Sequence, residues 1–188
     1  MTIRKILIYP DDQLRSIATP IADPTSAEIG ALIQDLADTM YDAPGVGLAA
    51  PQIGISLRIA VTDTHWRSGR YEGVGAGEGP DRRLNVWINP EILWRSDVLQ
   101  TYEEGCLSLP EMFADVSRPA AIRLRWLDEH GNKHERDFEG FEAVALQHEF
   151  DHLDGRVFID HLSVIKRKMI HRKLLKRKKM MISSEESA

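Results

Sequence analysis

Two histidines four residues apart, with a glutamate beside the first, are the residues of this sequence that point most directly to chemistry. Residues 147–155 read QHEFDHLDG, in which His148, Glu149 and His152 match H-E-x-x-H, a pattern that supplies two metal ligands and a carboxylate from one helix. A catalytic zinc site of this kind usually has three protein ligands and leaves one coordination position for water. A pair of hydrogen-bonded core histidines would give the same spacing, so the choice depends on a third ligand.

No third ligand follows this pattern in the positions that zinc proteases use. The longer protease pattern continues through Gly155, but Phe158 stands where the third histidine belongs, and His161 comes three residues too late. Other zinc proteases take a glutamate from a later helix, whereas residues 166–179 contain no acidic residue. The residues downstream therefore cannot complete a protease site.

A candidate third ligand lies upstream, in the stretch EEGCLSLP at 103–110. It contains Cys106, the only cysteine of the chain, in a segment that reads as extended. A lone cysteine is usually a small buried hydrophobic residue, so Cys106 alone does not establish a metal site. A folded sheet could lay this segment across the histidine helix.

A first helix is predicted near the N-terminus. Thr25 followed by Glu28 forms a capping-box pattern, and apolar residues then recur at helical spacing from Ile29 to Met40. A second helix carries the histidines. On it the apolar stripe that begins at Phe141 continues through His148 and His152, so both imidazoles should face inward and converge.

Short strands are predicted between the two helices. Runs at 57–62, 84–88 and 121–127 are apolar or alternating and rich in Val, Ile and Trp, and the sequence at 130–132 predicts a hairpin turn. The glycine-rich segment 68–81 reads as a flexible surface loop and not as a phosphate-binding loop.

Composition limits the class of protein. A chain of 188 residues with 43% hydrophobic residues is long enough for one domain with a real core. The first residues do not form a secretion signal, and no apolar run approaches the ~20 residues of a membrane helix. With Cys106 as its single cysteine, the chain cannot form an intrachain disulfide. We therefore expect a cytoplasmic protein with no membrane contact.

Charge is distributed unevenly along the chain. The net charge is −5, yet residues 166–179 hold nine of the 24 Lys and Arg residues and none of the 29 acidic ones. Ile165, Met169 and Ile170 share this predicted helix with the basic residues. The simple interpretation is a solvated helix whose apolar edge packs on the domain. Nothing in the sequence predicts recognition of a nucleic-acid sequence.

Three stretches in order give the chain its resemblance to a known family. They are GVGLAAPQ at 45–52, EGCLS at 104–108 and QHEFDH at 147–152, and together they resemble the peptide deformylases over nearly the whole chain. The first stretch also fits G-x-G-x-x-A, a dinucleotide fingerprint. That fingerprint must follow a strand and open a helix, whereas this stretch follows a helix and runs into Pro51.

The resemblance implies a metal site formed by Cys106, His148 and His152. The ion would be ferrous iron in the cell, with Ni²⁺, Co²⁺ or Zn²⁺ accepted in a purified preparation, although the softness of the ligands alone favours zinc. The implied reaction removes the formyl group from the N-terminal methionine of a new polypeptide and releases formate.

The resemblance also assigns the residues that would act on the substrate. Glu149 would move the proton, and Gln52 and the backbone amide of Leu107 would stabilise the oxyanion. The residues implied to contact the peptide and its methionine side chain are Val46, Gly47, Tyr102, Phe141, Val144 and Ala145.

The implied fold is α+β, with mostly antiparallel strands packed around a central metal-binding helix and with N-terminal and C-terminal helices. We expect residues 1–165 to form the catalytic part and 166–188 a basic helix and tail of the same domain. In bacterial members this helix contacts the ribosome, so the ribosome surface is the expected partner of residues 166–179. A zinc protease, or a non-catalytic protein with a structural metal, is the alternative function.

Overall fold

The computed structural model describes residues 2–65 and 82–185, the last seven by their backbone alone. The glycine-rich segment predicted to be a loop, 68–81, lies outside the described residues. The elements follow one another in this order: η1 (Asp12–Arg15), α1 (Ala27–Asp42), β1 (Gly47–Ala49), η2 (Ala50–Ile53), β2 (Ile59–Thr62), β3 (Asn85–Arg95), β4 (Leu99–Cys106), β5 (Leu109–Pro119), β6 (Ala121–Leu127), β7 (Lys133–Glu139), α2 (Gly140–Leu153), η3 (Phe158–His161) and α3 (Val164–Glu185).

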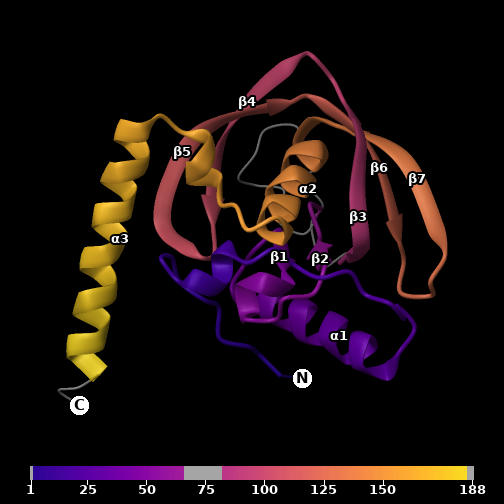
Figure 1. Ribbon diagram of the computed structural model, residues 1–188, viewed down its shortest axis with the longest axis horizontal. Coiled ribbons are helices and arrows are strands. Elements are labelled where there is room, and N and C mark those ends of the chain that lie inside the picture. The colour runs from indigo at the N-terminus through magenta and orange to yellow at the C-terminus, as the bar shows by residue number, and fades with distance from the viewer. Residues whose placement is uncertain (1, 66–81, 186–188) are drawn as a thin grey trace.

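The strands form two antiparallel sheets. One has five strands in the order β1-β2-β3-β6-β7, and the other is the β4-β5 pair. Figure 1 shows the strands arching around α2, with α1 on the side of the N-terminus and α3 standing apart at the C-terminal end. This arrangement confirms the predicted α+β class with antiparallel strands.

Helix α1 begins one residue later than the sequence pattern predicted. Its N-cap is Ser26, whose side chain accepts a hydrogen bond from the amide of Ile29, so the choice of Thr25 was wrong. The amide and hydroxyl of Thr25 instead donate to the carboxylate of Asp23 in the preceding turn. The helix then runs to Asp42, two residues beyond Met40, where the predicted apolar run ends.

The strand predictions differ in accuracy. β6 has the predicted bounds, and the turn after it contains Gly131 with φ +79°, whereas β3 continues seven residues beyond the predicted end. Strands β4 and β5 were predicted only as an extended stretch around Cys106. Their apolar residues are interrupted by charges and prolines, so the alternation that marks a strand is weak.

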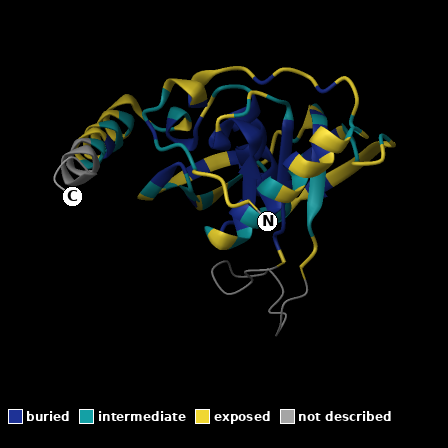
Figure 2. Cartoon of the chain, turned by 90° about the horizontal axis from the view of Figure 1, so that it is seen from below, coloured by how far each residue is buried: buried dark blue, intermediate teal, exposed yellow. Residues whose placement is uncertain are grey.

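Helix α2 is buried on every side. All residues from Ala143 to Leu153 are buried, including five that are polar or charged, and Figure 2 shows buried residues concentrated in the centre of the molecule. Its apolar members pack against Trp87, Ile122 and Phe138 of the five-stranded sheet. Buried polar groups cost free energy unless they are satisfied, so their presence in this helix requires an explanation.

Helix α3 packs on the domain through a narrow edge. Leu174 is fully buried, and Ile170 packs beside it in a cluster with residues of η1, β5 and η3. Ile165 and Met169, which were predicted to belong to this apolar edge, are 74% and 55% exposed. None of the helices in the described part of the chain combines the length and apolar composition that crossing a membrane requires.

Candidate active site

Strand β4 places Cys106 across the two histidines of α2. His148 and His152 lie one turn apart on the helix, and β4 ends at Cys106, where the register against β5 shifts. A shift of this kind redirects the side chain at the end of a strand. The sulfur lies 3.2 Å from Nε2 of His152, and the ligand atoms of all three residues lie within 4.8 Å of one another. The sheet therefore brings the upstream cysteine to the histidine helix, as the sequence indicated.

The tautomer of His148 is fixed by a buried carboxylate. Nδ1 of His148 lies 2.8 Å from Oε2 of Glu104. Burial raises the pKa of Glu104, but hydrogen bonds from His148 and Arg118 outweigh it and bring the pKa to about 2. Because an ionised carboxylate only accepts, Nδ1 carries a proton, and Nε2 is the ring nitrogen that can face a metal.

The chemistry of the three side chains fits a divalent cation. Burial and the neighbouring His148 hold the pKa of His152 well below its usual value, so its imidazole is neutral, the form that binds a metal. Nδ1 of His152 and Oε2 of Glu149 are buried without a hydrogen-bond partner. The site thus combines a thiol, two imidazoles and an unsatisfied carboxylate. A catalytic ion and its bound water would supply the partners that these groups lack.

Glu149 lies against the backbone of β1. A Cβ atom added to Gly47 would lie 2.3 Å from Oε1 of Glu149, so only glycine leaves room for this carboxylate. Burial raises the pKa of Glu149 to about 7, and the nearby charge of His148 opposes that rise. A bound divalent cation would also favour the ionised carboxylate. The side chain is thus held in one place and balanced between its two protonation states.

Gln52 presents its amide nitrogen to the cysteine. Oε1 accepts a hydrogen bond from the amide of Ala49 at 2.8 Å, which fixes the orientation of the side-chain amide. Nε2 donates to Oγ of Ser108 at 3.3 Å and lies 3.6 Å from the sulfur of Cys106. Leu107, the residue after Cys106, packs its side chain against Gly45. A Cβ added to Gly45 would lie 2.8 Å from Cδ1 of Leu107.

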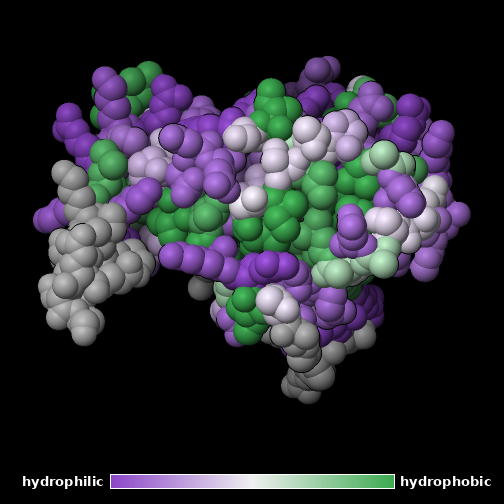
Figure 3. Space-filling model, turned by 60° about the horizontal axis from the view of Figure 1, so that its bottom comes forward, coloured by the Kyte–Doolittle hydropathy of each residue, from purple (hydrophilic) through white to green (hydrophobic). Residues whose placement is uncertain are grey.

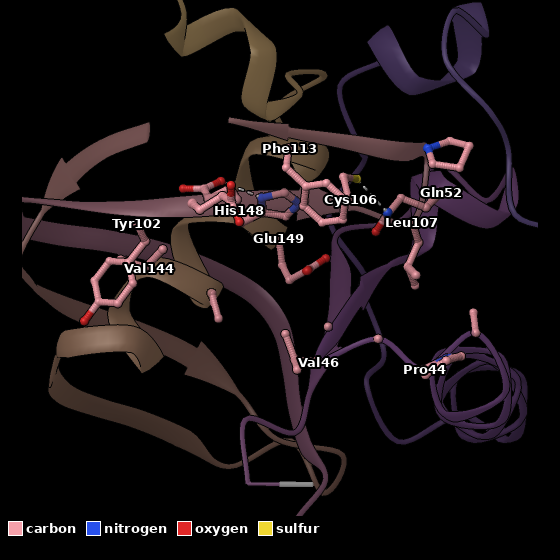
Figure 4. A pocket seen from close by; sticks show the side chains of 18 of the residues that line it. Pro44, Val46, Gln52, Tyr102, Cys106, Leu107, Phe113, Val144, His148 and Glu149 are labelled. Atoms are coloured by element: carbon pink, nitrogen blue, oxygen red, sulfur yellow. Dashed lines mark hydrogen bonds and ion pairs between the residues drawn. The ribbon is translucent and has the colours of Figure 1, made fainter. Parts of the chain in front are cut away.

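These residues surround a cavity of about 350 Å³. Figure 4 shows Cys106, His148 and Glu149 between two walls, one with Tyr102 and Val144 and the other with Gln52 and Leu107. The predicted site residues that line the cavity are Val46, Gly47, Gln52, Tyr102, Cys106, Leu107, Phe141, Val144, Ala145, His148 and Glu149. His152 is not in the lining and lies buried behind Cys106.

The sequence did not identify the charged groups behind the ligands. Arg118 bridges Glu104 and Asp151, and Asp151 also contacts His161, which was considered only as a metal ligand. Burial raises the pKa of Asp151, but His161 and Arg118 more than compensate and hold it far below its usual value. One feature of the sequence could have identified two of these groups, because Glu104 and Asp151 lie inside the same stretches as the candidate ligands, 104–108 and 147–152.

Comparison with known proteins places the chain in a family. The family model described as polypeptide deformylase matches residues 3–168. The peptide deformylase of Rhizorhabdus wittichii is 51% identical over 176 residues, which cover 94% of this chain and 96% of the relative. The crystal structure of a peptide deformylase from Legionella pneumophila superposes on this chain with a TM-score of 0.81 at 42% sequence identity. The match covers 96% of this chain and 98% of the Legionella chain.

A related structure contains a peptide. The class I type b peptide deformylase from Acinetobacter baumannii, solved with Met-Ala-Ser bound, has a TM-score of 0.76 and 32% identity, and the match covers 86% of this chain and 99% of that one. The family is metal-dependent, and the cluster of Cys106, His148 and His152 provides a site where an ion could bind. From the family model, the relatives and the shared structure, this chain belongs to the polypeptide deformylase family.

Proposed function

We propose that this chain removes the N-formyl group from new polypeptides with the residues that surround Cys106. The reaction itself follows from family membership: the N-terminal formyl-methionyl amide is hydrolysed, and formate and a free amino terminus are released. The observation that supports the assignment most is that Cys106, His148 and His152 converge at one side of a cavity beside the buried Glu149.

Cys106, His148 and His152 would hold one divalent cation, and we propose ferrous iron as the ion in the cell. When bound, such an ion supplies positive charge that makes water acidic near neutral pH and polarises a carbonyl. The protein's own contribution is to keep the imidazole of His152 neutral through burial and to orient that of His148 through its bond to Glu104. Metal analysis of protein purified without oxygen would identify the ion.

Glu149 would carry the proton of the reaction. It would accept a proton from the attacking water and deliver it to the departing nitrogen, because an amine leaves poorly unless it is protonated. A pKa of about 7 allows the group to serve in both directions near neutral pH. Its burial against Gly47 keeps the carboxylate within the cavity.

Gln52 and Leu107 would stabilise the negative charge that develops on the formyl oxygen. Donors contribute most when they are already oriented before the reaction. The bond from Ala49 to Oε1 of Gln52 turns Nε2 toward Cys106, which supports this role. For Leu107 the support is its position in the cavity beside Cys106.

The cavity would bind the first residues of the peptide. Tyr102, Phe141 and Val144 form an apolar wall suited to a methionine side chain, and Ala145 is their neighbour on α2. Val46 and Gly47 would hydrogen-bond to the extended peptide backbone, as in strand addition. The peptide Met-Ala-Ser in the Acinetobacter baumannii relative has the length and sequence of such a product.

The experiment that tests this function measures formate. Nickel-loaded protein should release formate from formyl-Met-Ala-Ser and should leave casein intact. Cleavage of casein would favour the zinc-protease alternative. Absence of both activities in a protein with a full complement of metal would favour a structural ion. Formylated chains are made in the bacterial cytoplasm, which is where we propose this chain works.

Helix α3 would be the contact with the ribosome. The basic side chains that the structure describes on this helix, up to Lys178, divide into two groups, of which the inner one is engaged: Arg167 with Asp160, Arg177 with Glu111, and Lys178 with the carbonyl of Pro10. The outer group is exposed and consists of Lys166, Lys168, Arg172, Lys173 and Lys176. At the left of Figure 3 the helix that leads to the C-terminal end carries mostly hydrophilic side chains with a few apolar ones between them.

Ribosome binding can be tested without removing the helix. Deleting it would also remove the buried Leu174 from the core, so the five outer residues should be changed to glutamine instead. The variant should sediment more weakly with ribosomes and should lose up to ~4 from the slope of log affinity against log salt, since each phosphate contact contributes ~0.7–0.9. Unchanged sedimentation at low salt would show that the contact lies elsewhere.

A further inference from the structure

A row of hydrogen bonds, buried from His148 to Asp151 and partly exposed at His161, leads away from the cavity to the start of the C-terminal helix. Nδ1 of His148 donates to Glu104 at 2.8 Å, and Arg118 donates to the same carboxylate at 2.5 and 3.0 Å. Arg118 also donates to Asp151 at 2.8 Å, and His161 lies 2.7 Å from the same oxygen of Asp151. The row connects a candidate metal ligand with η3, three residues before α3 begins.

Burial shows which member of the row can be changed with least damage. The side chain of Arg118 is 3% exposed and that of Glu104 is 6%, so removing either would leave a buried charge without a partner. The side chain of His161 is 31% exposed. Without His161, Asp151 would still be paired with Arg118, so no buried charge would be left without a partner.

The direction of the last bond can be deduced from the chemistry of the groups. Nη1 of Arg118 and Nε2 of His161 are 3.5 Å apart and both approach Oδ2 of Asp151. A guanidinium has no acceptor, and the carboxylate of Asp151 already accepts from Arg118 in an ion pair, so Nε2 of His161 is the donor to Oδ2. Asp151 is thus held from two directions by two donors on different elements.

We propose that His161 is a positioning residue for the metal site. By fixing Asp151 it fixes the guanidinium of Arg118, whose other edge holds Glu104 in the orientation that receives the proton of His148. The effect is on the direction and tautomer of His148, not on contact with the substrate. This inference depends on the proposed role of His148 as a metal ligand.

The test compares substitutions that keep or remove the donor. His161→Leu removes it, whereas His161→Gln places an amide N–H at a similar reach. His134→Leu is a matched control, because His134 makes an equivalent bond of 2.8 Å to Asp128 in the β6–β7 hairpin. Each protein is loaded with nickel, and the rate of metal loss to a chelator is measured. The visible spectrum of the cobalt form reports the ligand geometry independently of activity.

The expected result is that His161→Leu loses nickel ~10-fold faster and shows altered cobalt bands, since outer partners of metal ligands are usually worth 10-fold to 100-fold in affinity. His161→Gln and His134→Leu should stay within ~3-fold of the unchanged protein. The proposal is overturned if His161→Leu keeps the original rate and spectrum, or if His161→Gln loses metal as fast as His161→Leu. A His148→Ala protein that retains nickel would instead refute the ligand assignment in the proposed function.

Discussion

Replacing Gly47 by alanine should reduce catalysis by displacing Glu149 without touching the metal ligands. The added Cβ would lie 2.3 Å from Oε1, 2.7 Å from Cδ and 2.8 Å from Cγ of Glu149, whereas ordinary contacts begin at 3.4 Å. The carboxylate must therefore retreat by roughly 1 Å from its place in the cavity lining. A displacement of this size in a reacting group costs ~10²-fold in rate. We expect kcat to fall ~10²-fold while the metal content stays unchanged.

The assay has to separate this effect from the proposed contact of Gly47 with the peptide. Formate release gives kcat, and calorimetry with Met-Ala-Ser gives product affinity, which should change less than ~3-fold if Glu149 is the cause. Gly30→Ala is the matched control, because a Cβ there meets nothing within 4 Å. If Gly47→Ala keeps kcat within ~3-fold of the original, the placement of Glu149 does not depend on this glycine.

Three further changes have expected outcomes. Glu149→Gln should keep full metal occupancy and lose at least ~10²-fold in kcat, because an amide keeps the shape but cannot carry a proton; normal turnover with full metal would exclude the role. Gly155→Ala should lower the free energy of unfolding by at least ~2 kcal/mol, because Gly155 has φ +69° and an added Cβ would lie 2.4 Å from the carbonyl oxygen of Arg15. A denaturant titration measures this change, and an unchanged unfolding midpoint would contradict the expectation. Under peroxide, iron-loaded protein should lose its formate-releasing activity faster than nickel-loaded protein, and mass spectrometry should detect sulfinic acid at Cys106. Equal rates of loss would contradict the iron assignment.

The parts of the site that follow from local spacing could be predicted from the sequence. Two histidines four residues apart must lie on one face of a helix, and α2 has them buried there. No residue downstream stands where a third ligand is needed, which leaves Cys106 as the candidate, and the structure places its sulfur 3.2 Å from Nε2 of His152. These inferences need only the geometry of one helix and a count of ligands.

The groups behind the ligands could not be predicted in this way. Glu104 and His148 are 44 residues apart, and Asp151 and Arg118 are 33 apart, so their pairing depends on how the β4-β5 pair packs on α2. No periodicity along the chain encodes that packing. The choice of Thr25 as the N-cap is a smaller case of the same kind, since the competing bonds of Thr25 to Asp23 decided it.

The most direct test of the central claim is anomalous diffraction from crystals of the nickel-loaded protein. We expect one peak at the nickel edge, roughly 2.0–2.3 Å from Sγ of Cys106 and from Nε2 of both His148 and His152. The same map should leave Glu149 outside bonding distance of the ion. A peak that lacks any of the three ligands, or one bonded to Glu149, would contradict the assignment of the site.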